Sequence, residues 1–209
     1  MNSNPFETNN DLKFISKNLY QRPAWFLKFT QENYYGKYAW HFLYLAALGS
    51  QLGKIASMKS NIVSWSGLFF QILILGSGLT LLFYIICAYI FSATSKLFKG
   101  EATAGDILRV MSYSSIPAIV PLVFYVIGAI LYGLPFFSSS FWLADADLAQ
   151  RTFKYCVKII NTLAGINIMI FLVLGVAVVN NFSILKSILT ILSPMLILMS
   201  IILLMFTFS

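Results

Sequence analysis

Residues 60–95 are SNIVSWSGLFFQILILGSGLTLLFYIICAYIFSATS, and no aspartate, glutamate, lysine or arginine interrupts them. A helix crosses the hydrocarbon core of a bilayer with about 20 apolar residues, so this stretch is long enough to span it. Three further stretches, 110–144, 159–185 and 187–209, also lack all four charged residue types. Peptide groups in lipid must be satisfied within their own segment, and a helix does this. The sequence therefore predicts an all-α, polytopic integral membrane helical bundle.

The composition excludes a water-soluble globular domain and a disordered chain. Hydrophobic residues make up 59% of the 209 residues and charged residues only 10%, whereas a soluble domain carries about 25% charged residues. The net charge is +7, but the basic residues lie between apolar stretches and form no nucleic-acid-binding motif. We therefore interpret them as topology and headgroup signals, and expect membrane lipids and no nucleic acid as partners.

The uncharged stretches place four spans near 67–95, 108–133, 157–180 and 184–208. A fifth span is predicted near 38–57, where aromatic residues typical of a membrane interface crowd the start. The chain then divides into a cytoplasmic or interfacial N-terminal segment, 1–37, and a five-span membrane domain, 38–209. A four-span alternative stays open, because the uncharged part of the first candidate is short and contains three polar residues: His41, Ser50 and Gln51.

The distribution of basic residues predicts the orientation. With five spans, nine lysines and arginines lie on the N-terminal side and five on the other. The excess favours a cytoplasmic N-terminus and a C-terminus on the opposite side. Four spans also place the N-terminus inside, with ten against four. The segment 134–156 separates the two topologies, because it lies outside with five spans and inside with four.

Residues 11–33 are predicted to form amphipathic helix at the membrane interface. Leu12, Ile15 and Leu19 share one face. Arg22-Pro23 interrupts the pattern, and Pro23 is suited to the first position of a second helix. Aromatic residues beside cations then favour the headgroup boundary. A solvated tail is the alternative.

The loop 96–109 and the third span contain the clearest local signals. Gly100 is predicted to end the second span in a left-handed conformation. Thr103 and Asp106 have the spacing of a capping box. Pro117 and Pro121 each remove a backbone donor, which predicts a kink in the third span.

Small residues recur at positions where helices could approach closely. Gly49 and Gly53 are four residues apart in the first span, and Gly76 and Gly78 lie in the second. Such spacing suits packing within the bundle or between protomers, so a homo-oligomer or another membrane protein is a candidate partner.

Few residues suited to catalysis or to metal binding are present. The single histidine, His41, has no second ligand nearby in sequence, and Cys87 and Cys156 have no metal-binding spacing. No nucleophile elbow and no phosphate-binding glycine loop occurs. We therefore expect no catalytic residues, no metal, no cofactor and no enzymatic activity.

The segments Leu97–Thr103, Asp106–Val110 and Tyr113–Pro117 together resemble the central signature of the Yip family, the Ypt/Rab-GTPase-interacting membrane proteins, and especially its short bacterial members. The resemblance implies five spans, a cytoplasmic N-terminus and, for a bacterial member, the inner membrane. Eukaryotic members bind small GTPases through a longer N-terminal region. This chain has only about 37 residues there, which argues against a small GTPase as its partner.

Two functions follow as hypotheses. The first is a non-enzymatic scaffold or adaptor that organises membrane or partner proteins. The second is an uncoupled transporter or lipid-moving protein with a path between the third and fourth spans. Candidate residues for partner or headgroup binding are Lys99, Glu101, Asp106, Arg109, Tyr113 and Pro117. Ser115, Asn161 and Asn167, with Tyr113, are candidates for lining a cavity.

Overall fold

In the computed structural model, which describes residues 11–57, 64–137 and 147–207, the described elements are all helices. Two short helices precede the bundle, and the longest helix, α8, has 32 residues. The elements in chain order are α1 (Asp11–Gln21), α2 (Pro23–Glu32), α3 (Ala39–Ser57), α4 (Trp65–Phe70), the π-helical η1 (Gln71–Gly76), α5 (Ser77–Leu97), α6 (Ala104–Ser114), the 3-10 turn η2 (Ile116–Ala118), α7 (Ile119–Tyr132), the 3-10 turn η3 (Leu134–Phe137), α8 (Leu148–Val179) and α9 (Ile184–Thr207).

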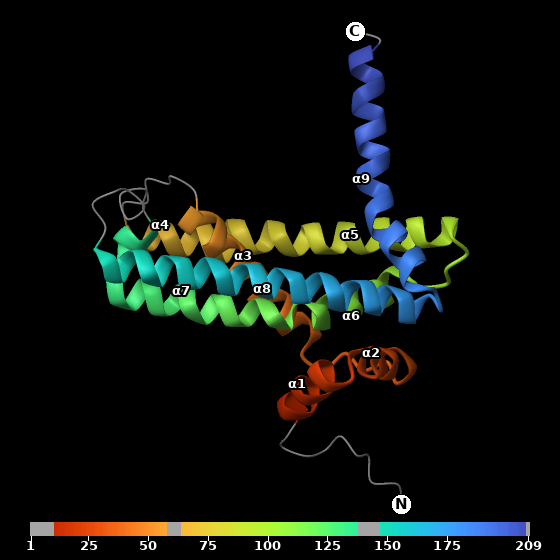
Figure 1. Cartoon of the computed structure of the whole chain (residues 1–209), viewed down its shortest axis with the longest axis horizontal. Coiled ribbons are helices and arrows are strands. Elements are labelled where there is room, and N and C mark those ends of the chain that lie inside the picture. Colours follow the sequence, from red (N-terminus) through yellow and green to blue (C-terminus); the bar gives the residue numbers. More distant parts are fainter. Residues whose placement is uncertain (1–10, 58–63, 138–146, 208–209) are drawn as a thin grey trace, which may run out of the picture.

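The bundle consists of α3, α5, α6 with α7, and α8, which run lengthwise beside one another (Figure 1). α4, η1 and α5 follow one another without a break, whereas Ser115 separates α6 from η2, which leads directly into α7. Its apolar contacts form one cluster around Tyr125 and Phe136 and another around Ile107 and Val176. The outward faces remain apolar, which is the pattern of a bundle whose solvent is lipid.

Three described helices are long and apolar enough to cross a membrane: Trp65–Leu97, Ala104–Tyr132 and Leu148–Val179. They correspond to the predicted second, third and fourth spans, so the prediction of a helical membrane protein is confirmed. α3 forms where the first span was predicted, and α9 where the last was, but neither belongs to this set. The number five is therefore not established by helix length and composition.

The third span is interrupted at the prolines, as the sequence predicts. α6 ends at Ser114, a 3-10 turn containing Pro117 follows, and α7 begins at Ile119. Pro121 is the third residue of α7, where its missing N–H costs little because first-turn donors have no partner within the helix. The Ser115 hydroxyl donates to the Ser112 carbonyl at 2.7 Å and satisfies an acceptor beside the break.

The glycines of α3 pack inside the bundle. A Cβ on Gly49 would lie 3.2 Å from the Ala118 carbonyl oxygen, and one on Gly53 would lie 3.0 Å from the Tyr125 hydroxyl. A Cβ on Gly76 would likewise lie against the Gln51 side chain, whereas a Cβ on Gly78 would meet no atom within 4 Å. The prediction of close helix packing is thus confirmed within the bundle for the first three glycines.

α9 leaves the bundle at a steep angle near the end where α5 meets α6 (Figure 1). Its first turns are anchored, because the Ser187 hydroxyl donates to the Val173 carbonyl at 2.6 Å and the Thr94 hydroxyl donates to the Thr190 carbonyl at 3.1 Å. Farther along α9, Leu196 is exposed. The last predicted span therefore forms a helix but crosses the others instead of lying along them.

Candidate functional site

The loop after α5 has a different backbone from the predicted one. Lys99, not Gly100, adopts the left-handed conformation, with φ of 66°. The Gly100 N–H donates to the Ser95 carbonyl at 2.9 Å, which closes the end of α5. The prediction for Gly100 is wrong because this glycine is needed for space and not for its backbone angles.

The space is taken by Asn180, from the turn between α8 and α9. A Cβ on Gly100 would overlap the Asn180 side-chain oxygen. That buried oxygen accepts the Ala102 N–H at 3.1 Å, and the Asn180 amide group donates to the Val176 carbonyl at 3.0 Å. Asn180 therefore holds the loop 98–103 against the far end of α8.

The predicted capping box at the start of α6 is confirmed. The Asp106 N–H donates to the Thr103 hydroxyl at 3.3 Å, and the Thr103 N–H donates to the Asp106 carboxylate at 3.0 Å. Asp106 also pairs with Arg109 at 3.5 Å, and both side chains are about four-fifths buried, with 18% and 19% exposed. This pair fixes the direction of the Arg109 guanidinium.

Arg109 contacts the N-terminal segment. One of its guanidinium nitrogens donates to the Thr30 carbonyl of α2 at 3.4 Å. Its guanidinium carbon lies 5.8 Å from the centre of the Tyr34 ring, a distance at which a cation is attracted to an aromatic face. Arg109 thus joins the end of α2 to α6.

Tyr113 is fully buried and makes the second contact with this segment. Its hydroxyl lies 2.9 Å from the Lys37 carbonyl oxygen and 3.3 Å from that of Tyr35, so it donates into the connection between α2 and α3. Its ring packs edge-on against Phe26 with centroids 5.3 Å apart. One side chain therefore fixes both α2 and the start of α3.

Two further contacts complete the attachment of the N-terminal helices. The second of these helices, α2, begins at Pro23 as predicted. The Gln31 amide donates to the Val179 carbonyl at the end of α8 at 3.3 Å. The Tyr20 ring packs edge-on on Phe171 at 5.6 Å, and partial burial raises the pKa of its phenol above the ordinary value. We call Tyr20, Gln31, Arg109 and Tyr113 the docking contacts.

The remaining predicted residues are scattered. Lys99 and Glu101 are exposed on the loop, and Pro117 is buried in η2. Ser115 is buried at the break between α6 and α7. The Asn167 amide donates to the Leu163 carbonyl of its own helix at 2.9 Å, whereas Asn161 lines a cavity. The structure therefore brings Asp106, Arg109 and Tyr113 together and separates them from Asn161.

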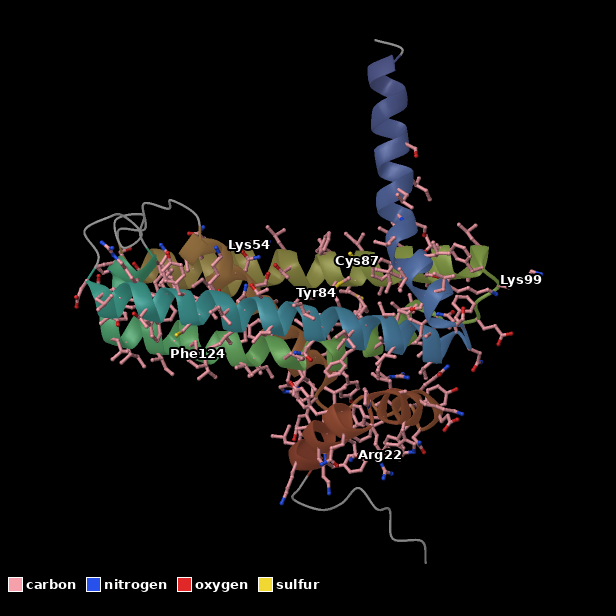
Figure 2. All side chains as sticks on the ribbon, in the orientation of Figure 1. Arg22, Lys54, Tyr84, Cys87, Lys99 and Phe124 are labelled. Atoms are coloured by element: carbon pink, nitrogen blue, oxygen red, sulfur yellow. The ribbon has the colours of Figure 1, made fainter. Side chains whose placement is uncertain are left out.

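That cavity, which we call the lysine groove, lies between α3, α7 and α8 and has a volume of about 740 Å³. Its polar residues include three lysines, Lys54, Lys154 and Lys158. Small residues of α3 and α8, with Ala118 of η2, form much of the rest of its wall. Figure 2 shows Lys54 far along the bundle from Lys99, so the groove and the loop 98–103 are separate sites.

The sequence contained a signal for the groove that charge counting does not use. Five residues of α8 are spaced alternately four and three positions apart, which places their side chains on one face of a helix. They are Lys154, Lys158, Asn161, Gly165 and Ile168. All five line the groove. A polar and small face in a helix otherwise bounded by lipid is the pattern that predicts a cavity.

Within the described ranges no group of three or more histidine, cysteine, aspartate or glutamate side chains could hold a metal ion.

A family model described as the Yip1 domain matches residues 21–206. No curated protein and no solved structure shows a significant match to the chain.

Proposed function

The chain belongs to the Yip family, and on that premise we propose that it is a non-enzymatic membrane scaffold that presents a cytoplasmic surface to a partner membrane protein. The proposal includes five spans, formed by α3, α4 to α5, α6 to α7, α8 and α9, with a cytoplasmic N-terminus. As the fifth span, α9 turns from its crossing direction into line with the other four in the bilayer. For a short bacterial-type member the membrane is the bacterial inner membrane.

The attachment of the N-terminal helices carries this proposal. Gln31, Arg109 and Tyr113 join α2 and the following connection to α6 and α8, so the segment before the first span is part of the folded body. The Asp106–Arg109 pair lies between this segment and the loop that bears Lys99 and Glu101. A rigid, charged surface of this kind binds a partner without the entropy cost of ordering a tail.

The charge of this surface indicates what it binds. The proposed cytoplasmic side carries nine of the 14 lysines and arginines, which suits an acidic juxtamembrane segment as well as anionic lipid. The exposed pair Lys99 and Glu101 has one charge of each sign, which favours a protein partner of complementary pattern over a lipid surface alone.

Photo-crosslinking in intact membranes tests the scaffold. A photoreactive residue at Glu101 is expected to give a discrete protein adduct, and the same residue at Leu131, an exposed apolar position of α7, is expected to give lipid adducts. Lys99→Glu is expected to weaken the protein adduct. Equal adduct patterns at both positions, or no effect of the charge reversal, would contradict the proposal.

The lysine groove supports a second candidate function, the movement of lipid. It lies between the third and fourth spans and α3, and no acidic residue lines it among the described residues, so it offers no carboxylate for ion coupling. Reconstituted protein is then expected to accelerate exchange of fluorescent phospholipid between leaflets. Exchange equal to that in protein-free vesicles would remove this candidate.

A further inference from the structure

The lysine groove is held open by its backbone and small side chains. Gly49 and Gly53 of α3 and Ala164 and Gly165 of α8 all line it. A Cβ built on Gly165 meets no atom within 4 Å, so the space beside this residue is empty of protein. A cavity of about 740 Å³ falls in the range of about 300–1,000 Å³ typical of sites for small organic ligands.

The groove has one charged end and one apolar end. Lys54 lies near the end of α3, and Lys154 and Lys158 lie in the first third of α8. Farther along, the wall consists of residues such as Ala118 and Ile168. A ligand that fills the groove must therefore combine an anionic group with an apolar chain.

The length of α8 places the charged end at the depth of lipid headgroups. The helix has 32 residues and extends about 48 Å, whereas the hydrocarbon core is about 30 Å thick. The excess of about 18 Å corresponds to about 12 residues. Residues 159–185 carry no charge, so the excess belongs to the start of α8, where Lys154 and Lys158 lie.

The position of these lysines in the proposed topology is unusual. In the proposed five-span arrangement they lie on the side opposite the cytoplasm, which is the side that basic residues normally avoid. Five lysines and arginines lie there, and three of them line a single cavity. A ligand with a negative charge is attracted to this concentration of basic side chains.

We propose that the lysine groove binds one anionic phospholipid. Its phosphate lies among Lys54, Lys154 and Lys158, and one acyl chain runs along Gly165 toward Ile168. Asn161, one turn beyond Lys158, is positioned to donate its amide to the glycerol or ester oxygens. The site is distinct from the loop and the docking contacts. Its place opposite the cytoplasm rests on the five-span arrangement proposed above, but its binding of lipid does not depend on the scaffold role.

Binding of lipid to the full-length protein tests the assignment. The protein is purified in neutral detergent and titrated with phosphatidylglycerol or with phosphatidylcholine of the same acyl chains, and bound lipid is counted by native mass spectrometry. Each lysine near an anionic lipid contributes about five-fold in affinity. One phosphatidylglycerol is expected to bind more tightly than phosphatidylcholine, and the triple variant Lys54→Gln, Lys154→Gln, Lys158→Gln should weaken it roughly 100-fold.

Two controls isolate the charged end. The triple variant Lys17→Gln, Lys96→Gln, Lys186→Gln removes the same charge at exposed positions away from the groove and is expected to leave affinity unchanged. Inorganic phosphate at millimolar concentration is expected not to displace the lipid. Displacement would show that the lysines bind free phosphate and would overturn the assignment to a lipid.

A second variant tests the acyl-chain end without altering charge. Gly165→Leu projects into the empty groove, and Gly78→Leu projects into open space on α5, outside the groove. Gly165→Leu is expected to weaken phosphatidylglycerol binding by about ten-fold or more, and Gly78→Leu to leave it unchanged. Two results would refute the proposal. One is equal affinity of Gly165→Leu and Gly78→Leu for phosphatidylglycerol, and the other is equal binding of phosphatidylglycerol and phosphatidylcholine to the unaltered protein.

Discussion

Replacing Tyr113 by phenylalanine removes one hydroxyl from the centre of the docking contacts. The ring keeps its place, because the edge-on contact with Phe26 at 5.3 Å depends on the aromatic face and edge. The hydroxyl, however, is the donor to the Lys37 carbonyl at 2.9 Å. Tyr113→Phe should therefore loosen the N-terminal helices while it leaves the bundle intact.

The size of the effect follows from the burial of the two partners. Tyr113 is fully buried, but its acceptors lie in the partly exposed connection between α2 and α3, where water can replace the lost donor. The cost is then at the lower end of the range for a broken hydrogen bond, about 1–1.5 kcal/mol. This corresponds to a roughly five- to ten-fold increase in the open population of residues 11–37.

Hydrogen exchange of the protein in lipid nanodiscs measures this population. Amides of α1 and α2 in Tyr113→Phe are expected to exchange about five- to ten-fold faster, and those of α7 and α8 at the original rate. Tyr125→Phe is the matched control, since its hydroxyl has no hydrogen bond among the described residues. Unchanged exchange in α1 and α2, or acceleration throughout the bundle, would refute the role assigned to Tyr113.

Three further outcomes are expected. Asn180→Ala leaves the buried Ala102 N–H without its acceptor and should lower the free energy of unfolding by about 1–3 kcal/mol, measured by denaturant titration in detergent. Gly175→Val places a side chain where Val110 lies and should destabilise the contact of α6 with α8 by about 1–3 kcal/mol, measured by thermal unfolding. A cysteine introduced as Ser139→Cys, outside the described residues, should react with an impermeant thiol reagent from the external face.

Each of these outcomes has a matched comparison. Asn167→Ala removes an amide that bonds only its own helix, and it should cost less than Asn180→Ala. Gly78→Val enters open space and should be nearly neutral. The labelling needs a background in which Cys87 and Cys156 are replaced by serine. Labelling of Ser139→Cys only after the membrane is opened would favour four spans.

Helix positions could be predicted from the sequence because charge is excluded from lipid. Spans predicted at 67–95 and 108–133 correspond to helices over Trp65–Leu97 and Ala104–Tyr132. The capping box at Thr103 and the break at Pro117 were also predictable, because both depend on residues close together in the chain. Local rules suffice where the interacting groups are neighbours in sequence.

Contacts between distant segments could not be predicted in this way. The site residues Asp106, Arg109 and Tyr113 were selected from the loop and the start of the third span. Nothing in their spacing indicated that Arg109 reaches Thr30 or that Tyr113 reaches Lys37. Gly100 shows the same limit. Its environment is formed by Asn180, which is 80 residues later in the chain. A glycine that provides space and one that provides a left-handed turn have the same sequence signature.

The direction of a helix is a further property that apolar composition leaves open. Residues 187–209 lack charge and predict immersion in lipid, but apolar length does not by itself set the direction of a helix. Packing decides the direction, and the hydrogen bonds of α9 to other helices involve Ser187 and Thr190 in its first two turns. Beyond them, Pro194 leaves the Thr190 carbonyl without its helical donor, and the Thr94 and Ser193 hydroxyls bind that carbonyl instead. The turn where α9 leaves the bundle is therefore held by α5. Among the described residues, Thr94 is the one side chain of α5 that donates to the Thr190 carbonyl, so loss of its hydroxyl removes this connection.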